Sequence, residues 1–203
     1  MDRTNTVQIL RGCPAVRKID MFDNIGKSLF TKFLIWSSRF EKPAEVINYR
    51  SILGQVKRVL IYIPDSIEDQ RARSIHERAQ SCFPNAHLEY VLVEKLPSLR
   101  REFLPSLMSQ DQINVVTRED VGFWGILKKN FLENLKDKQF DLVLDFSSTF
   151  DISLAHAFRA SGAPIIAGFF LGRESELFHN LLIKTGEHEL FDPTLFDCLS
   201  QLR

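Results

Sequence analysis

Several side chains that could bind or deprotonate a ligand follow a short apolar run, residues 59–63 (V-L-I-Y-I), which Pro64 ends. These side chains are Asp65, Ser66, Glu68 and Asp69. A run of this composition predicts a strand that is covered on both faces of a parallel sheet. Ligands of open α/β sheets bind beyond the carboxyl ends of such strands. We therefore expect a binding crevice here, and it carries three carboxylates, Asp65, Glu68 and Asp69.

A second polar group follows another apolar run, residues 141–146. It consists of Asp145, Ser147 and Ser148. Asp145 could hydrogen-bond a ligand or cap the next helix, and Asp65 could likewise bind a ligand or serve as a turn and cap residue. Asp69 is either a functional position or an ordinary acid that the dipole of a first helical turn favours. We interpret His156, on the helix that follows, as a core residue.

Strands and helices alternate along residues 55–203. Strands are predicted at 59–63, 86–93, 113–117, 141–146 and 164–169, and helices at 67–82, 121–138, 150–160, 174–184 and 193–202. Residues 96–108 also have helical spacing, which two prolines interrupt. The alternation predicts an α/β fold, a single Rossmann-like, doubly wound parallel sheet of five strands or slightly more. The strand at 59–63 should lie centrally, with helices on both faces.

Residues 1–50 form an N-terminal extension with a different character. Apolar residues recur at spacings of three and four over 19–40, which predicts an amphipathic helix. We expect Phe22, Phe33 and Trp36 to pack against the domain or a second copy of it; an anionic membrane surface is the alternative. Residues 1–60 carry a net charge of +6 and the remainder −6. The acidic main body argues against a nucleic-acid partner.

The number of cysteines and the absence of cofactor-binding motifs limit which ligands and cofactors the chain is expected to bind. Three widely spaced cysteines and no clustered histidines indicate neither a disulfide framework nor a metal site. The sequence contains no glycine-rich dinucleotide motif and no phosphate-binding loop, so we expect no cofactor. It has no signal peptide and no apolar run of membrane-spanning length. We expect a cytoplasmic protein, with peripheral attachment to the inner membrane as the alternative.

Four segments in this order resemble glycosyltransferase family 9, the lipopolysaccharide heptosyltransferase family. They are I-P-D-S-I-E-D (63–69), F-P-N-A (83–86), F-D-L-V-L-D (140–145) and Gly168-Phe169. The family begins with a strand, R-P-D-x-I-G-D, a helix and F-P-x-A. The resemblance covers about residues 58–203 and corresponds to the N-terminal, acceptor-side half of these enzymes.

The resemblance implies a GT-B enzyme that transfers heptose from ADP-heptose to a lipid-linked sugar without a metal. The last aspartate of the family string, the proposed general base, corresponds to Asp69. The chain departs from the string at Glu68, where the family has glycine, and at Ile63, where it has arginine. Residues 151–156 (D-I-S-L-A-H) also resemble the D-x-G-x-x-H segment of the family's nucleotide-binding half. We interpret that match as a coincidence between related halves.

A GT-B enzyme requires two Rossmann-like halves, and 203 residues accommodate one. We therefore expect a glycosyltransferase-like half domain without independent catalysis, which binds a sugar, a lipid-linked acceptor or a protein partner. One alternative is an active transferase whose donor site another chain or a second copy supplies. The other is an unrelated, flavodoxin-like regulatory domain.

Overall fold

One parallel sheet organises the computed structural model, which describes residues 32, 47–64, 66–93, 112–122, 125–184 and 191–203. The strands are β1 (Arg58–Tyr62), β2 (His87–Val93), β3 (Ile113–Val116), β4 (Leu142–Asp145), β5 (Ile165–Phe169) and β6 (Leu181–Ile183). Within these residues the order is β3-β2-β1-β4-β5-β6, and every pairing is parallel. The predicted α/β class, the parallel sheet and the central position of β1 are confirmed.

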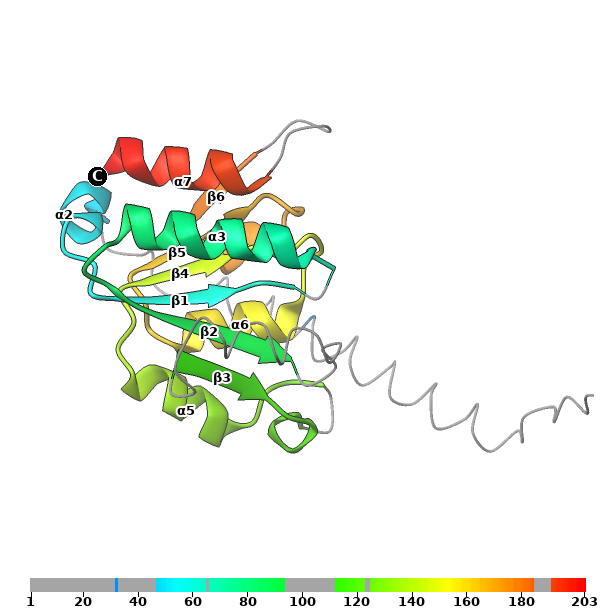
Figure 1. Ribbon diagram of the computed structural model, residues 1–203. Coiled ribbons are helices and arrows are strands. Elements are labelled where there is room, and N and C mark those ends of the chain that lie inside the picture. Colours follow the sequence, from blue (N-terminus) through cyan, green and yellow to red (C-terminus); the bar gives the residue numbers. More distant parts are fainter. Residues whose placement is uncertain (1–31, 33–46, 65, 94–111, 123–124, 185–190) are drawn as a thin grey trace, which may run out of the picture.

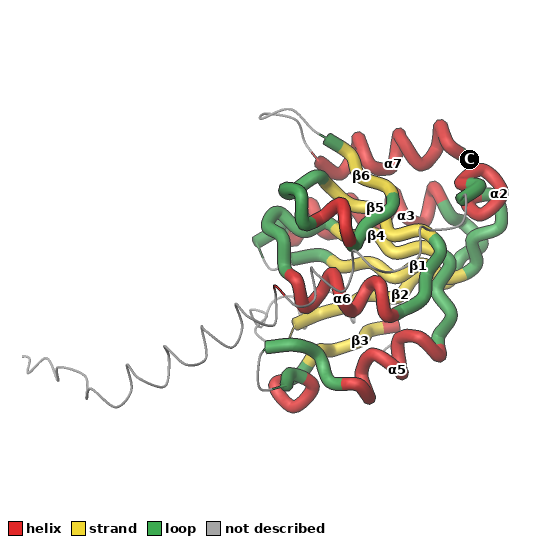
Figure 2. Tube along the Cα trace, turned by 180° about the vertical axis from the view of Figure 1, so that it is seen from behind, coloured by secondary structure: helices red, strands yellow, loops and turns green. Residues whose placement is uncertain are grey.

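Helices cover both faces of the sheet (Figure 1). The helices of the described residues are α2 (Tyr49–Leu53), α3 (Asp69–Cys82), α5 (Lys129–Asp137), α6 (Ile152–Ala160) and α7 (Phe191–Leu202). Side chains of α2, α3 and α7 pack on one face, and those of α5 and α6 pack on the other. The view from behind shows the same three layers (Figure 2).

Strand β1 is apolar because both of its faces are buried. Val59 and Ile61 point into the core under α3 and α7, whereas Leu60 and Tyr62 point into the core under α5 and α6. Each of these side chains is at most 8% exposed. Burial of one such side chain stabilises the fold by about 1.5–3 kcal/mol. The strand therefore anchors both cores and fixes the position of the loop that follows it.

The helix predicted for 121–138 begins later than expected, at Lys129. Val121 and Leu127 instead form an isolated antiparallel bridge, and the Gly122 N–H donates to the Ile126 carbonyl at 2.7 Å. Gly125, at φ 78°, supplies the left-handed residue of this turn. The apolar periodicity of the segment extends across the turn, which is why the prediction was wrong at its amino end.

The helix predicted for 174–184 is wrong. A short 3₁₀ turn, η3 (Ser175–Leu177), is followed by the edge strand β6, which pairs with β5. Asn180 directs this change, because its side chain accepts from the Ile166 N–H at 2.8 Å and donates to the Pro164 carbonyl at 2.8 Å. Residues 181–183 therefore form a strand because they pair with β5, and the local sequence does not reveal this distant partner.

The predicted amphipathic helix at 19–40 and the segment 96–108 lie outside the described residues, except for Lys32, which is helical and exposed. The predicted packing of Phe22, Phe33 and Trp36 stays a prediction. Within the described part of the chain, none of the helices combines the length and the apolar character needed to cross a bilayer.

Candidate functional site at the carboxyl edge of the sheet

The centre of the sheet contains a topological switch point between β1 and β4. From β1 the chain continues towards β2 and β3, and from β4 it continues towards β5 and β6 on the other side. Tyr62 pairs with Asp145, and the Phe146 N–H donates to the Tyr62 carbonyl at 3.1 Å. The loops after β1 and β4 thus begin side by side. In doubly wound sheets this edge is where ligands bind.

The loop after β1 turns at Pro64, whose carbonyl accepts from the Ile67 N–H at 3.1 Å. Ile67 is buried, so it anchors the loop in the core, whereas Ser66 and Glu68 are exposed. Asp65 lies outside the described residues. This anchoring places the exposed polar side chains at the edge where the sequence predicted them.

Helix α3 begins at Asp69, two residues later than predicted. Its N-cap is Glu68, which makes no side-chain capping hydrogen bond. The N-cap position is therefore not residue 65, and the prediction for the Asp65 side chain lies outside the described residues. Glu68 has φ −64° and ψ 150°, which is an ordinary extended conformation. This loop therefore does not need the backbone freedom of glycine, the residue at this position in the R-P-D-x-I-G-D motif of glycosyltransferase family 9. Asp69, half-buried, occupies the first helical position.

Asp145, at the end of β4, is turned inward. Its Oδ1 accepts from the Ser147 N–H at 2.9 Å and from the Ser147 hydroxyl, and its Oδ2 lies 2.8 Å from His179 Nε2. Asp145 and Ser147 are both buried. Asp145 does not cap the next helix, which corrects that expectation: Asp151 does so, accepting from the N–H groups of Ser153 and Leu154 at 2.8 and 3.2 Å.

His179 is the residue of this edge that sequence reasoning missed. It follows η3, in a stretch predicted to be helical, and its side chain is 1% exposed. Its Nδ1 lies 3.2 Å from the Ser175 carbonyl, and its ring lies against Gly168 of β5. A Cβ at position 168 would lie 3.0 Å from the ring and 3.3 Å from the Asp145 carbonyl oxygen, so glycine favours this close approach. The pair of Asp145 and His179 therefore connects the loop after β4 to the segment between η3 and the edge strand β6.

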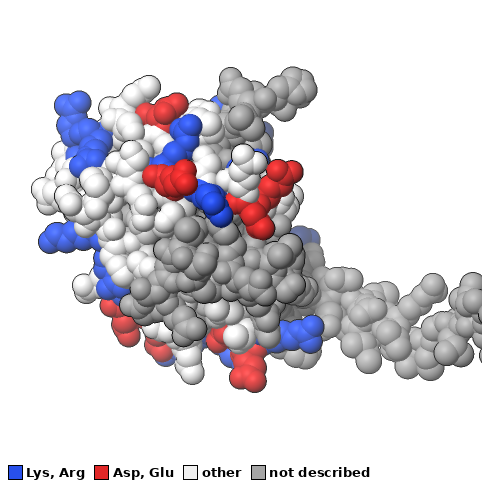
Figure 3. Space-filling model, in the orientation of Figure 1, with Lys and Arg blue, Asp and Glu red and all other residues white. Residues whose placement is uncertain are grey.

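The two loops divide the predicted site residues into two groups. Ser66, Glu68 and Ser148 are exposed and Asp69 is half-buried, whereas Asp145 and Ser147 use their polar atoms on internal partners. A ligand at this edge would meet the exposed side chains of Ser66, Glu68 and Ser148, and Asp145 and Ser147 would shape the loop. Figure 3 shows that acidic and basic side chains are intermixed on the face that carries α3.

The segment that resembles a nucleotide-binding motif, residues 151–156, has structural roles. Asp151 caps α6, and the Ser153 hydroxyl donates to the Gly125 carbonyl at 2.6 Å. His156 is half-buried in the same helix. The described residues contain no group of three or more His, Cys, Asp or Glu side chains that could hold a metal ion.

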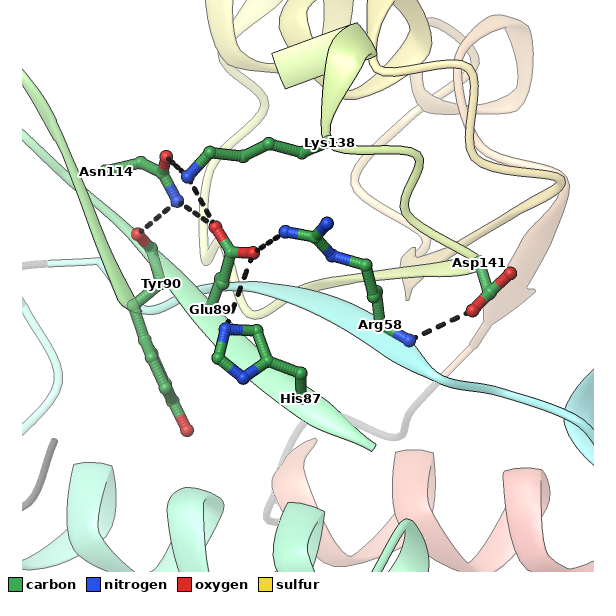
Figure 4. Close-up of polar contacts among 7 residues, drawn as sticks. All are labelled: Arg58, His87, Glu89, Tyr90, Asn114, Lys138 and Asp141. Carbon is green, nitrogen blue, oxygen red and sulfur yellow. Dashed lines mark hydrogen bonds and ion pairs between the residues drawn. The ribbon is translucent and has the colours of Figure 1, made fainter. Parts of the chain in front are cut away.

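A buried charge network lies far from this edge, at the amino half of the sheet (Figure 4). Glu89 of β2 is 1% exposed, and its carboxylate is bound by Arg58, by Lys138 at 2.6 Å and by the Asn114 amide at 3.1 Å. Lys138 also donates to Asn114 Oδ1 at 2.7 Å. Asp141 fixes the start of β1 by accepting from the Arg58 N–H at 2.9 Å.

The Glu89 network joins three strands and the end of α5, and we assign it a structural role. Burial raises the pKa of the Glu89 carboxyl, but the hydrogen bonds from Lys138, Arg58 and Asn114 outweigh this effect, and the pKa lies below its usual value. The carboxylate is therefore ionised at neutral pH. Its charge is matched internally rather than offered to a ligand.

Comparisons with known proteins leave the function open. Residues 102–202 are similar to a family of unknown function, DUF6913. No curated protein and no solved structure matched the chain. A functional assignment therefore rests on the geometry of the carboxyl edge.

Proposed function

We propose that this chain is a glycosyltransferase-like half domain that binds a carbohydrate at the edge between β1 and β4 and does not transfer sugars by itself. The observation that carries the proposal is the arrangement at the switch point. The loop after β1 presents Ser66, Glu68 and Asp69, and the loop after β4 presents Ser148 beside it. These side chains match the hydroxyl-rich surface of a sugar.

The charge of this edge favours a neutral polyhydroxyl ligand over a phosphate. A helix N-terminus ordinarily attracts anions through its free N–H groups. Here Glu68 and Asp69 place carboxylates at the N-cap and the first position of α3, where they repel a phosphate. The same carboxylates accept hydrogen bonds from sugar hydroxyls, and such charge-assisted bonds are among the stronger ones.

The proposed lack of independent transfer rests on the architecture that the reaction needs. In a GT-B transferase one Rossmann-like half holds the acceptor and another holds the nucleotide. The described residues form one such sheet. Asp69 could serve as the base for a bound acceptor, but these residues offer no second half to position a donor. The strand order also differs from the 2-1-3-4-5 order of flavodoxin-like domains, which gives that alternative no support.

A sugar titration followed by ¹H–¹⁵N NMR tests the proposal. The full chain is titrated with free heptose and, for comparison, with mannose. We expect saturable shifts confined to the amides of residues 63–69 and 146–149. Absence of saturation up to about 100 mM would contradict sugar binding, because a Kd of about 100 mM corresponds to a binding free energy of only about −1.4 kcal/mol.

Matched variants locate the binding. Glu68→Gln and Asp69→Asn remove charge at nearly constant size, and each is expected to weaken heptose binding about tenfold, or about 1.4 kcal/mol. Asp137→Asn, an exposed position at the end of α5, serves as the control and should bind like the parent chain. A sugar-binding role of this kind would place the protein in the cytoplasm, near the membrane that carries lipid-linked acceptors.

A further inference from the structure

A separate cavity of about 320 Å³ lies at the amino end of β2, at the opposite edge of the sheet from the switch point. Its lining includes His76 and Gln80 of α3, Phe83 of the following turn, His87 and Leu88 of β2, and Gln112 before β3. The volume is at the lower end for ligand pockets, so it suits a small molecule. The sugar proposal does not use this cavity, and the Glu89 network meets it only at His87, whose Nε2 lies 3.8 Å from Glu89 Oε1.

The strongest polar feature of the cavity is a buried histidine. His76 is 7% exposed, and its Nδ1 lies 2.8 Å from the hydroxyl of Tyr90, which is completely buried. Burial lowers the pKa of His76, against a smaller opposing effect of Glu77, so the imidazole is neutral at pH 7. A neutral imidazole has one donor and one acceptor nitrogen.

The Tyr90 contact decides which nitrogen is the donor. Burial raises the pKa of Tyr90, so its hydroxyl keeps its proton. Among the described residues His76 Nδ1 is the group in reach of that hydroxyl, and an unsatisfied buried O–H would cost about 1–3 kcal/mol. Tyr90 therefore donates to Nδ1, and the proton of His76 sits on Nε2. We take this Nε2–H as the donor that His76 offers to the cavity it lines.

The other residues that line the cavity favour a ligand that has a hydrogen-bond acceptor at one end and an apolar group at the other. Gln80 adds an amide N–H₂ donor, and the side chains of Phe83 and Leu88 provide apolar wall. No Asp or Glu is among the residues that line the cavity. The nearest carboxylates do not compete: Glu77 is exposed on α3, and Glu89, 3.8 Å from His87, is held by Arg58 and Lys138.

We propose that this cavity binds a small aliphatic carboxylate. The carboxylate oxygens accept from the Nε2–H of His76 and from the Gln80 amide, and the short alkyl chain lies against Phe83 and Leu88. Phosphate and sulfate are disfavoured because the apolar wall offers them no hydrogen-bond partner. A divalent metal is disfavoured because two histidines and two amides make a poor ligand set for it.

The test uses the full chain with ¹⁵N- and ¹³C-labelled histidine, titrated at pH 7 with butyrate or with butyramide, its neutral isostere. The chain contains five histidines, and His76→Gln identifies the His76 signals by their loss. We expect saturable shifts of the His76 ring signals with butyrate and at least about tenfold weaker binding of butyramide. Equal binding of the two probes, or no saturable shift with butyrate, would overturn the proposal.

Gln80→Leu and Gln70→Leu provide a matched pair on the same helix. Both glutamines are exposed on α3, but Gln80 lines the cavity. Gln80→Leu should weaken butyrate binding about tenfold, whereas Gln70→Leu should leave it unchanged. Equal effects of the two substitutions would contradict the assigned site. Thermal unfolding of each variant shows that it is folded before the titration.

Discussion

Two buried strand carboxylates show how the same chemical group takes different roles at the residue scale. Glu89 lies between two cations and an amide, and it links β1, β2 and β3 to the end of α5. Asp145 has a histidine and a serine as partners, and it shapes a loop at the candidate site. Both follow the rule that a buried polar group is tolerated when its hydrogen bonds are satisfied.

Loss of the Glu89 charge should strongly destabilise the fold. In Glu89→Gln the ammonium of Lys138 and the guanidinium of Arg58 lose their counter-charge in a partly buried site. We expect the free energy of unfolding to fall by about 2–4 kcal/mol, somewhat below the cost for fully buried pairs because both cations are partly exposed. Urea denaturation measures this. The exposed pair of Lys129 and Glu133 provides the control, since Glu133→Gln should cost under about 0.5 kcal/mol.

The same carboxylate should make stability depend on acid pH. The pKa of Glu89 is lower in the folded chain than its unfolded value of about 4.3. The stabilisation is therefore complete above that unfolded value and is lost as the pH falls through the lower, folded pKa. We expect the parent chain to lose more stability than Glu89→Gln between about pH 4.5 and 2. Parallel losses in both proteins would show that Glu89 is not the responsible group.

Gly168 should resist substitution because of the His179 ring. In Gly168→Ala the new Cβ would lie 3.0 Å from that ring, which the Asp145 carboxylate and the Ser175 carbonyl hold in place. We expect a loss of about 1–3 kcal/mol in unfolding free energy. A double-mutant cycle supplies the control: in a His179→Ala background the Gly168→Ala cost should largely disappear. Additive costs would mean that the ring is not the obstacle.

At the scale of elements, periodicity predicted most of the fold. The strands at 59–63, 86–93, 113–117, 141–146 and 164–169 and the helices at 67–82, 150–160 and 193–202 were predicted to within a few residues. Their signals are local, an apolar run or a repeating face. Strand β6 and the turn before α5 were missed, because each depends on a partner distant in sequence or on a left-handed glycine.

The candidate site was predictable only in part, for the same reason. The sequence indicated that Glu68, Asp69, Asp145 and Ser147 follow two strands, and the parallel pairing of β1 and β4 brings these loops together. It could not indicate that Asp145 turns inward, because its partner His179 is 34 residues away. Glu89 was missed similarly, since its partners come from β1, β3 and the residue after α5.

Two helix starts with different caps give an element-scale prediction. The Asp151 side chain caps α6 through two hydrogen bonds, whereas the Glu68 side chain makes no capping bond to α3. Asp151→Ala should therefore lower the free energy of unfolding by about 0.5–2 kcal/mol, and Glu68→Ala by less than about 0.5 kcal/mol. Urea denaturation of the two variants checks this difference. A larger cost at Glu68 would indicate that its carboxylate is held by the fold rather than available to a ligand.

At the scale of the whole molecule, the sheet separates three polar regions. The switch-point loops lie at the carboxyl edge, whereas the Glu89 network and the cavity beside His76 lie towards the amino ends of the strands. Two further cavities, of about 470 and 570 Å³, also lie at the amino ends of strands, before β1 and β2 and before β5. Sugar binding and carboxylate binding should consequently be independent of one another, with neither ligand changing the affinity for the other.

The central claim is that the carboxyl edge binds a sugar but neither holds a nucleotide-sugar donor tightly nor transfers from it. Calorimetry of the full chain with ADP-heptose, combined with an assay for released ADP, tests this most directly. We predict no binding tighter than about 1 mM and no release of ADP, because carboxylates occupy the N-terminus of α3 and one Rossmann-like sheet cannot position both substrates. Micromolar binding that is lost in Asp69→Ala or His156→Ala would contradict the account and would identify residues 151–156 as a working nucleotide site.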